Sequence, residues 1–274
     1  MRPSRRFWTR SAGSSSVTFT PDLNACAALV RRADPDRFLA TMAAPVATRR
    51  VLFPLWAFNV EVARAPWVTA EPMIAEMRLQ WWRDALEEIA AGAGVRRHEV
   101  VTPLADALPP GLARALDAAV AARRWDIYRD PFGDAADFEA YLDQTSGTLL
   151  WAAARGLGDA DETVVRDFAY AAGVAGWLRA IPALEARGRI PLLDGTPDGV
   201  RALAAQASDR LARARAARAR VSPEAAPALL SGWQAGDILR QAEREPERVA
   251  RGALGLSEAR RRLSLMLRAA SGRW

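Results

Sequence analysis

Apolar residues recur at intervals of three and four positions along almost the whole chain from Pro21 onward. This spacing gathers them on one face of an α-helix, whereas a half-buried strand alternates apolar and polar residues. No alternating run extends beyond a few residues, and no glycine-rich loop follows a strand pattern. The sequence therefore predicts an all-α protein. The expected helices cover residues 22–33, 36–43, 46–65, 71–91, 111–129, 135–156, 161–181, 198–220, 223–243 and 256–270.

Loops rich in glycine, proline and aspartate separate these helices, and none of them is long enough to link two domains. A chain of 274 residues with 50% hydrophobic residues can bury one large core. We therefore expect residues 22–274 to form a single helical domain. Residues 1–21 hold four arginines and many serines but no acid. We expect them to be a disordered or mis-assigned N-terminal extension, with a mitochondrial presequence as the alternative.

The composition excludes several kinds of chemistry. Cys26 is the only cysteine and His98 the only histidine, which rules out an internal disulfide and leaves almost no material for a zinc site or a Ser/His or Cys/His nucleophile. No run of about 18 apolar residues is present, so no membrane-spanning helix is expected. All 38 basic residues are arginine, which with the abundant alanine is typical of a GC-rich bacterial coding sequence. The net charge of +6 suits an acidic partner, whether nucleic acid, a diphosphate or an anionic membrane.

The helix expected at residues 71–91 contains an unusual stretch, "EMRLQWWRDALEEI", at residues 76–89. A helical wheel places Trp81, Trp82 and other apolar residues on a broad arc, with Arg78 projecting into its centre. We therefore expect neighbours to bury this helix on more than one side. An unpaired guanidinium would be costly there, so Arg78 should form an internal ion pair or line a cavity.

The helix expected at residues 46–65 is apolar nearly all round its wheel, except for a narrow stripe that holds Arg50, Glu61 and Arg64. Pro54 is expected to kink this helix. We expect the charged stripe to pair internally or to touch solvent along one edge, with a water-filled pocket as the alternative.

A strongly basic stretch, "DRLARARAARARV", spans residues 209–221. Its helix could lie against anionic lipid or an acidic protein partner, and an ordinary solvated helix is the alternative. We do not expect it to bind nucleic acid, because no aromatic residue is interleaved with the arginines to stack on bases. The candidate surface-binding residues are Arg210, Arg213, Arg215, Arg218 and Arg220.

Four stretches together resemble the squalene and phytoene synthase family: "RRVLFPLWAF", "EMRLQWWRDALEEI", "ARRWDIYRDPFGDAADFEAYLDQTSGTLL" and "LRAIPALEARGRIPLL". The resemblance runs from about Cys26 to about residue 195. It implies the isoprenoid-synthase helical fold, whose central cavity in active members joins two prenyl diphosphates head to head. The residues considered as cavity candidates are Arg50, Glu61, Arg78, Trp81, Trp82, Asp126 and Tyr141.

Active members of this family hold a divalent metal with two aspartate-rich motifs, because Mg²⁺ prefers carboxylate oxygens. The resemblance places the first motif at Ala63 and Trp67 and the second at Ala180 and Leu184. None of these four residues is a carboxylate. Pro182 is further expected to end the helix on which the second motif should lie.

Asp126, Asp130 and Asp134 keep a four-residue spacing. We expect these acids to cap helix ends or to pair with neighbouring arginines, since a single cluster at a helix end is a poor substitute for two facing motifs.

These departures resemble a non-catalytic branch of the family, which contains the mitochondrial assembly factor for respiratory complex I. By analogy, the expected partner is a complex I subunit or assembly intermediate, and no metal cofactor is expected. A peripheral contact with the membrane and a prenyl lipid bound in the cavity are both compatible with this analogy. The expected location is the bacterial cytoplasm or the inner face of its membrane, or the mitochondrial matrix if the N-terminus is a presequence. The alternative is an active prenyltransferase that uses Mg²⁺.

Overall fold

The computed structural model describes residues 19–92 and 94–274. Within these ranges the chain is built from helices, and the only extended pairing is an isolated bridge between Ala160 and Val221. The predicted all-α class is thereby confirmed. None of the helices in the described part is both long and apolar enough to cross a bilayer. Residues 1–18, which make up most of the expected N-terminal extension, lie outside the described residues.

The longer helices are α1 (Pro21–Ala33), α2 (Pro35–Ala43), α3 (Arg49–Arg64), α4 (Pro72–Ala91), α9 (Ala135–Leu142), α10 (Thr148–Leu157), α11 (Glu162–Glu185), α12 (Pro197–Ala216), α14 (Ala235–Arg244) and α16 (Glu258–Ser271). The shorter α-helices are α5 (Val101–Ala107), α6 (Pro110–Ala115), α7 (Asp117–Ala122), α8 (Arg124–Ile127), α13 (Ala226–Leu229) and α15 (Glu247–Ala250). Single turns of other helix types are η1 (Val46–Thr48), η2 (Ala65–Trp67), the π-helix η3 (Asp143–Gly147), η4 (Arg218–Arg220) and η5 (Leu230–Gly232).

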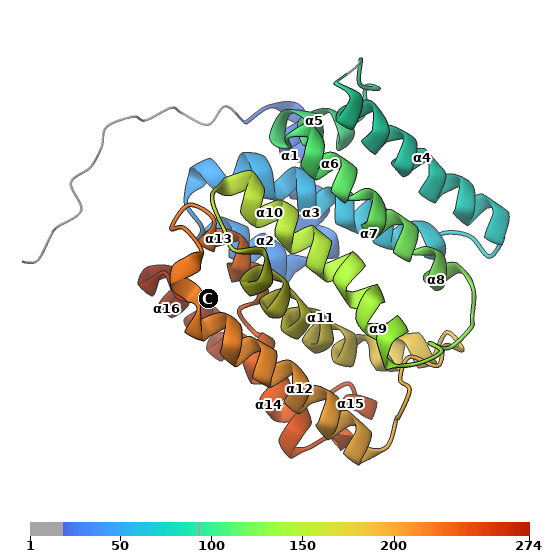
Figure 1. Ribbon diagram of the computed structural model, residues 1–274, viewed down its shortest axis with the longest axis vertical. Helices are drawn as coiled ribbons and strands as arrows, with labels where there is room; N and C mark the ends of the chain where they lie inside the picture. The colour runs from blue at the N-terminus through green and yellow to red at the C-terminus, as the bar shows by residue number, and fades with distance from the viewer. Residues whose placement is uncertain (1–18, 93) are drawn as a thin grey trace, which may run out of the picture.

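Helices α1 and α2 begin at sequence signals of the same kind. Thr20 caps α1 and Asp34 caps α2, and each side chain accepts a hydrogen bond from the backbone N–H of the third residue of its helix. A proline follows each cap, and at the first helical position its missing N–H leaves no bond unmade. The two helices are therefore separated by Asp34 alone, and both pack beside α3 (Figure 1).

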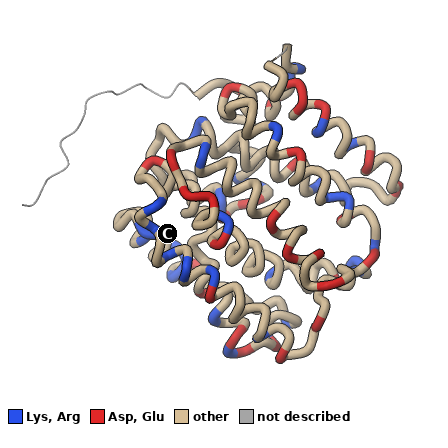
Figure 2. Tube along the Cα trace, in the orientation of Figure 1, with Lys and Arg blue, Asp and Glu red and all other residues tan. Residues whose placement is uncertain are grey.

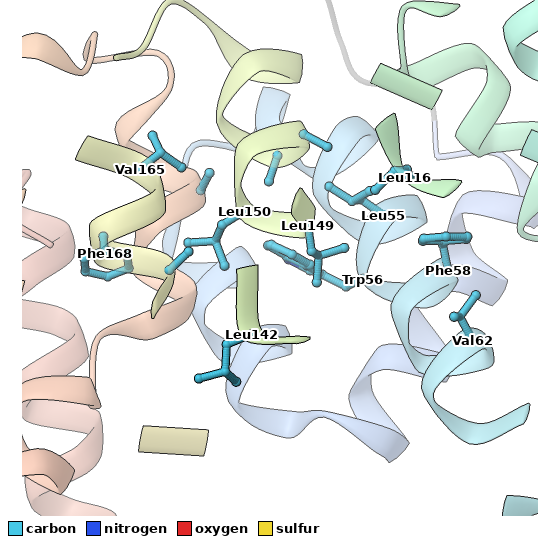
Figure 3. Packing of buried hydrophobic residues seen from close by; sticks show 14 of the residues in the cluster. Leu55, Trp56, Phe58, Val62, Leu116, Leu142, Leu149, Leu150, Val165 and Phe168 are labelled. Atoms are coloured by element: carbon cyan, nitrogen blue, oxygen red, sulfur yellow. The ribbon is translucent and has the colours of Figure 1, made fainter. Parts of the chain in front are cut away.

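The hydrophobic core is centred on α3, whose residues 51–58 are all buried. Trp56 is 1% exposed, and Leu149 and Leu150 of α10 lie beside it (Figure 3). Trp56 Nε1 donates a hydrogen bond to Thr41 Oγ1 at 3.1 Å, which satisfies the one polar atom that the indole buries. Because each fully buried large apolar side chain contributes about 1.5–3 kcal/mol, this cluster is a principal source of the stability of the fold.

Helix α11 runs through the middle of the molecule (Figure 1). Helix α10 and η3 pack against it from one direction, and α12 and α14 pack against it from another. Helix α4 lies at the edge of the molecule, where it packs on α6 and α7 (Figure 1). A row of small residues on α11 lines the cavity described below.

Several helices differ from the predicted ones. The helix expected at 111–129 is divided into α6, α7 and α8, and the one expected at 135–156 is interrupted by the π-helix η3. Helices α5 and α15 were not predicted. Helix α12 ends at Ala216, and only the separate turn η4 continues its direction toward Arg220. Breaks of this kind depend on how neighbouring helices pack, which hydrophobic spacing alone does not specify.

Pro182 does not end its helix, contrary to the prediction. Helix α11 continues to Glu185 with Pro182 inside it. Pro182 has no backbone N–H to bond the carbonyl of Leu178, four residues earlier, yet the helix continues for three more residues. Helix α3 likewise continues without a break across Pro54.

Helix α4 buries a narrow stripe and not the broad arc that its wheel suggested. The buried residues are Ala75, Leu79, Trp82, Ala85, Leu86 and Ile89. Arg78 is exposed, and Ile74 is 39% exposed. The prediction that neighbours bury α4 on more than one side was therefore wrong, because the helix lies at the edge of the molecule.

Candidate functional site

A cavity of about 310 Å³ lies between α11 and the segments α3, α8, α9 and η3. Ala63 and Trp67 line it from the end of α3 and from η2, and Ala180 and Leu184 line it from α11. The four positions that the sequence resemblance assigned to the metal motifs thus meet at one cavity. We treat this central cavity as the candidate functional site.

The cavity exists because α11 presents very small residues to it. Ala172, Gly173, Gly176 and Ala180 all line it at helical spacing. A Cβ atom added at Gly176 would meet no other atom within 4 Å, whereas one added at Gly173 would lie 2.9 Å from Ser146 Oγ. The helix therefore borders open space at Gly176, whereas at Gly173 it packs closely against η3.

A second cavity, of about 250 Å³, adjoins the first. The two cavities share the lining residues Arg37, Ser146, Ala172, Gly173 and Gly176. They therefore form two parts of one hollow along α11.

The carboxylate of Asp36 lines the second cavity but is fully engaged. Its Oδ2 accepts hydrogen bonds from Arg179 Nη1 at 3.0 Å and from Gln234 Nε2 at 2.8 Å. Its Oδ1 accepts one from Arg261 Nη1 at 2.8 Å. Asp36 thus holds α2, α11 and α16 together.

A buried triad of polar side chains forms part of the wall of the central cavity. Tyr141 Oη donates a hydrogen bond to Asp126 Oδ2 at 2.9 Å, and Arg123 Nη1 donates to the same oxygen at 3.3 Å and to Tyr141 Oη at 2.8 Å. Asp126 is only 5% exposed and Tyr141 only 6%. The pairing between Asp126 and a neighbouring arginine is the one that the sequence predicted.

The environment of the triad favours one set of protonation states. Burial raises the pKa of Tyr141, so its hydroxyl stays protonated and remains a donor. Burial alone would lower the pKa of Arg123, but the neighbouring Tyr141 and Asp126 outweigh this effect and the pKa is raised. The carboxylate of Asp126 therefore faces two protonated donors.

Arginine and tryptophan side chains lie together at the mouth of the cavity. The guanidinium of Arg187 lies 4.7 Å from the ring centre of Trp67. Arg189 is 4% exposed, stacks 4.1 Å from the ring of Trp125 and donates to the backbone carbonyls of Trp125 and Tyr128. Burial lowers the pKa of Arg189. The position that the resemblance assigned to the second acid of the first motif thus carries an indole stacked with a cation.

The residues lining the central cavity do not fit Mg²⁺. Asp126 is the only carboxylate among them, and it already binds Arg123 and Tyr141. Mg²⁺ requires several oxygen ligands in a near-octahedral arrangement, usually including carboxylates without a competing cation. In residues 19–92 and 94–274 as a whole, no three His, Cys, Asp or Glu side chains are close enough together to hold a metal ion.

Most of the other cavity candidates lie elsewhere. Arg50 is exposed near the start of α3, and it lines neither cavity. Glu61, Arg78, Trp81 and Trp82 surround a separate surface cavity of about 220 Å³. Of the seven candidates, the central cavity brings together only Asp126 and Tyr141.

Two residues of the charged stripe on α3 pair with each other, as the sequence predicted. Glu61 pairs with Arg64 at 3.6 Å, three residues along the same helix. Trp81 and Trp82 meet edge to face at 5.0 Å, and the cation that stacks on Trp81 is Arg96, at 4.8 Å from the ring centre. Both tryptophans of α4 thus line this separate cavity, and neither lines the central one.

Three residues of the central cavity, Arg37, Trp177 and Arg187, were not singled out from the sequence. Each of them lies on a helix or just beyond its end. The helical wheels of these helices did not indicate a cavity. The available signal was the run of alanine and glycine at three- and four-residue steps in "AYAAGVAGWLRA", residues 169–180. The side chains on such a helix face are too small to fill the space between packed helices.

The basic stretch of α12 and η4 does not form a free positive face. Arg213 pairs with Asp167 at 3.2 Å and Arg220 with Asp161 at 3.4 Å, and Arg210 pairs with Glu139. Arg215 Nε donates to the backbone oxygen of Trp274 at 3.1 Å, and burial, followed by nearby arginines, lowers its pKa to about 10. The remaining candidate, Arg218, is exposed and donates to the backbone oxygen of residue 215. Figure 2 shows the same mixing of basic and acidic positions along the chain.

The sequences of several animal proteins are similar to this one over most of its length. "NADH dehydrogenase (ubiquinone) complex I, assembly factor 6" of Rattus norvegicus is 26% identical over 271 residues, which cover 86% of this chain and 78% of the rat protein. The Homo sapiens protein of the same name is 25% identical, with 80% and 73% covered. The Drosophila melanogaster homolog is 30% identical over a shorter region, 57% of this chain and 50% of that protein.

Two solved structures have a similar fold. A dehydrosqualene synthase in complex with a ligand superimposes with a TM-score of 0.72, at 14% sequence identity, over 91% of this chain and 95% of that one. Squalene synthase HpnC from Alicyclobacillus acidocaldarius superimposes with a TM-score of 0.64, at 20% identity, over 82% and 94%. These likenesses confirm the expected isoprenoid-synthase helical fold. The sequence profile of squalene/phytoene synthases matches residues 30–192, more than half of the chain, and the protein therefore belongs to the squalene/phytoene synthase family.

Proposed function

We propose that this protein is a non-catalytic member of its family and that it assists the assembly of respiratory complex I. The observation that carries the first part is the composition of the cavity wall, where Ala63, Trp67, Ala180 and Leu184 occupy the positions assigned to the metal motifs. The second part is supported by the relatives named as complex I assembly factors, which match most of the chain.

The chemistry of the family explains why the wall matters. Ionisation of an allylic diphosphate separates charge, and the leaving diphosphate must be neutralised as it forms. A wall of alanine, leucine and tryptophan supplies no ligand for the metal that usually does this. Asp126 is left as a single carboxylate that is already bound to Arg123 and Tyr141. The cavity therefore lacks the electrostatic support that the reaction requires.

The same cavity remains suited to holding a prenyl lipid without reacting with it. Trp67, Trp177 and the small residues of α11 offer apolar surface, and Arg187 offers a cation for an anionic head group. Lipid binding of this kind would rest on shape and charge, as in other ligand pockets with few polar groups.

Enzyme activity is tested with purified protein and farnesyl or geranylgeranyl diphosphate in the presence of Mg²⁺. We expect no diphosphate release above the uncatalysed background, and calorimetry should detect no Mg²⁺ binding. If a product forms, and if Asp126→Asn abolishes its formation, the protein is instead an active prenyltransferase.

Lipid binding is tested with two variants at one position. Gly176→Leu should fill the cavity and abolish binding of a prenyl diphosphate in calorimetry. Gly176→Ala adds a single methyl group to open space and should leave binding within about twofold of the unmodified protein, since it adds no contact. Equal binding by the leucine variant would place the ligand outside the cavity.

The assembly role is tested by deleting the gene from its host. We expect loss of membrane NADH:quinone activity and accumulation of incomplete complex I, while succinate oxidation continues. Expression of the Asp126→Asn variant should restore activity, because the role does not depend on catalysis. Unchanged NADH:quinone activity in the deletion strain would contradict the proposal.

A further inference from the structure

Helix α16 presents an apolar stripe on the side that faces away from the protein. Leu263, Met266 and Leu267 follow one another at helical spacing and are 57%, 66% and 62% exposed. The exposed Ala259 and Ala270 extend this outer stripe in both directions. A surface helix normally places polar residues on its outer side, so the stripe is suited to contact with something outside the molecule.

The opposite side of α16 is firmly attached to the body of the protein. Leu265 is 5% exposed and packs in a small cluster with Ala40 of α2 and Trp233. Arg261 binds the carboxylate of Asp36 at 2.8 Å. The helix therefore lies at the periphery of the molecule (Figure 1), and the residues of the outer stripe are exposed.

The charges around the outer stripe are almost all positive. Residues 258–273 contain five arginines and one acid, Glu258, which pairs with Arg262. At about 100° per residue, Arg260 and Arg262 fall on opposite edges of the outer stripe. Arg260 and Arg273 are exposed, and neither forms an ion pair within the described part of the chain. One arginine thus lies at each edge of the apolar centre.

We infer that α16 docks the protein on the surface of an anionic lipid bilayer. An in-plane helix of this kind buries its apolar side chains at the level of the acyl boundary while arginines at its edges reach the phosphates. The order of groups on α16 matches that arrangement: leucine and methionine at the centre and guanidinium groups on both sides. This inference does not depend on the proposed role in complex I assembly.

A second copy of the chain fits the outer stripe less well. Pairing of two copies around a two-fold axis would bring Arg260 and Arg262 of one copy toward the same residues of the other. No acidic residue on the outer side of α16 could offset that repulsion. An anionic surface satisfies both the apolar and the charged parts of the helix.

The inference is tested by flotation of the full chain with vesicles of phosphatidylcholine, with and without phosphatidylglycerol. We expect binding to the anionic vesicles that weakens with added salt, and little binding to neutral ones. The triple variant Leu263→Ser, Met266→Ser, Leu267→Ser should bind at least about tenfold more weakly, because it removes most of the apolar surface that would be buried. Arg260→Gln should weaken binding about fivefold.

A matched control removes exposed apolar side chains from another helix. Met73 and Met77 of α4 are 75% and 66% exposed, and the double variant Met73→Ser, Met77→Ser should bind vesicles like the unmodified protein. Met266→Glu, a single change at an exposed position, should also abolish binding. It provides a second test in case the triple variant misfolds, and circular dichroism checks that both variants are folded. Equal binding to neutral vesicles, or undiminished binding by the stripe variants, would overturn the inference. So would a dimer in solution that the triple variant dissociates.

Discussion

The hydroxyl of Tyr141 bridges the carboxylate of Asp126 and the guanidinium of Arg123. Its hydrogen bonds to these two groups, 2.9 Å and 2.8 Å long, are shorter than the direct contact of 3.3 Å between them. Tyr141→Phe would leave Asp126 with only the 3.3 Å contact from Arg123. We expect this variant to lower the free energy of unfolding by about 1–2 kcal/mol, as measured by urea denaturation. Tyr128→Phe is the control, because Tyr128 is 46% exposed and its change should stay within about 0.5 kcal/mol. An equal loss in both variants would argue against a special role for the buried hydroxyl.

Stability should also decline at alkaline pH. Burial raises the pKa of Cys26 from 9.0 to about 12, and it also raises the pKa of Tyr141 above its ordinary value of 10.0. Both groups are neutral when protonated, so the folded state binds protons that the unfolded chain releases. Their contribution is complete below pH 9 and is lost progressively as the pH rises above 9 and 10, respectively.

Denaturation at a series of pH values measures this decline. Tyr141→Phe should show a shallower fall above about pH 10 than the unmodified protein, because one of the titrating groups is absent. Identical slopes in the two proteins would mean that Tyr141 does not titrate differently in the folded and unfolded states.

Among the helices, α11 offers the sharpest comparison. Gly176→Ala should stabilise the protein by about 0.5–1 kcal/mol, because alanine loses less backbone freedom than glycine in a helix. Its Cβ would meet nothing within 4 Å. Gly173→Ala should destabilise it, because the Cβ would lie 2.9 Å from Ser146 Oγ. Thermal unfolding of the two variants, three residues apart, separates helix propensity from packing, and a shift of both in the same direction would contradict this account.

Hydrophobic spacing predicted that helices such as α4 and α11 exist, but it did not predict what surrounds them. A wheel shows which residues share a face of α4, whereas the exposure of Arg78 depends on the position of α4 at the edge of the molecule. The proline rule likewise did not predict that α11 continues through Pro182 to Glu185. The breaks around η3 carry no signal in the spacing of apolar residues.

For the molecule as a whole, Trp274 ties the last residues of the chain to the core. It is 4% exposed and meets Phe168 of α11 edge to face at 5.0 Å. Trp274→Ala should lower the free energy of unfolding by about 3–5 kcal/mol through loss of this packing. Arg273→Gln, one residue earlier and exposed, should change it by less than about 0.5 kcal/mol. Urea denaturation compares the two, and a loss of less than about 1 kcal/mol for the alanine variant would show that the indole contributes little.

The family and the fold could be predicted from the sequence, because several moderately specific stretches occur in the order that the family has. The candidate site could be predicted only in part. The spacing of those stretches predicted two motif positions, Ala63 and Ala180, that line one cavity in the structure. Both residues lie on helices whose positions the fold determines. It gave no information on Arg187 or Arg37, because their place depends on how helix ends approach one another. The same limit applies to the arginines of α12, whose partners lie on other helices.

The bond between Asp36 and Arg261 joins residues 225 positions apart. At a synthesis rate of about 5–20 residues per second, Asp36 waits about 10–45 seconds on the ribosome before its partner has even been made. During that interval α2 and α11 lack the helix that completes their polar contacts, and apolar surface meant for α16 remains open to other chains. We therefore expect a growing chain with this topology to keep that surface exposed until α16 has been made.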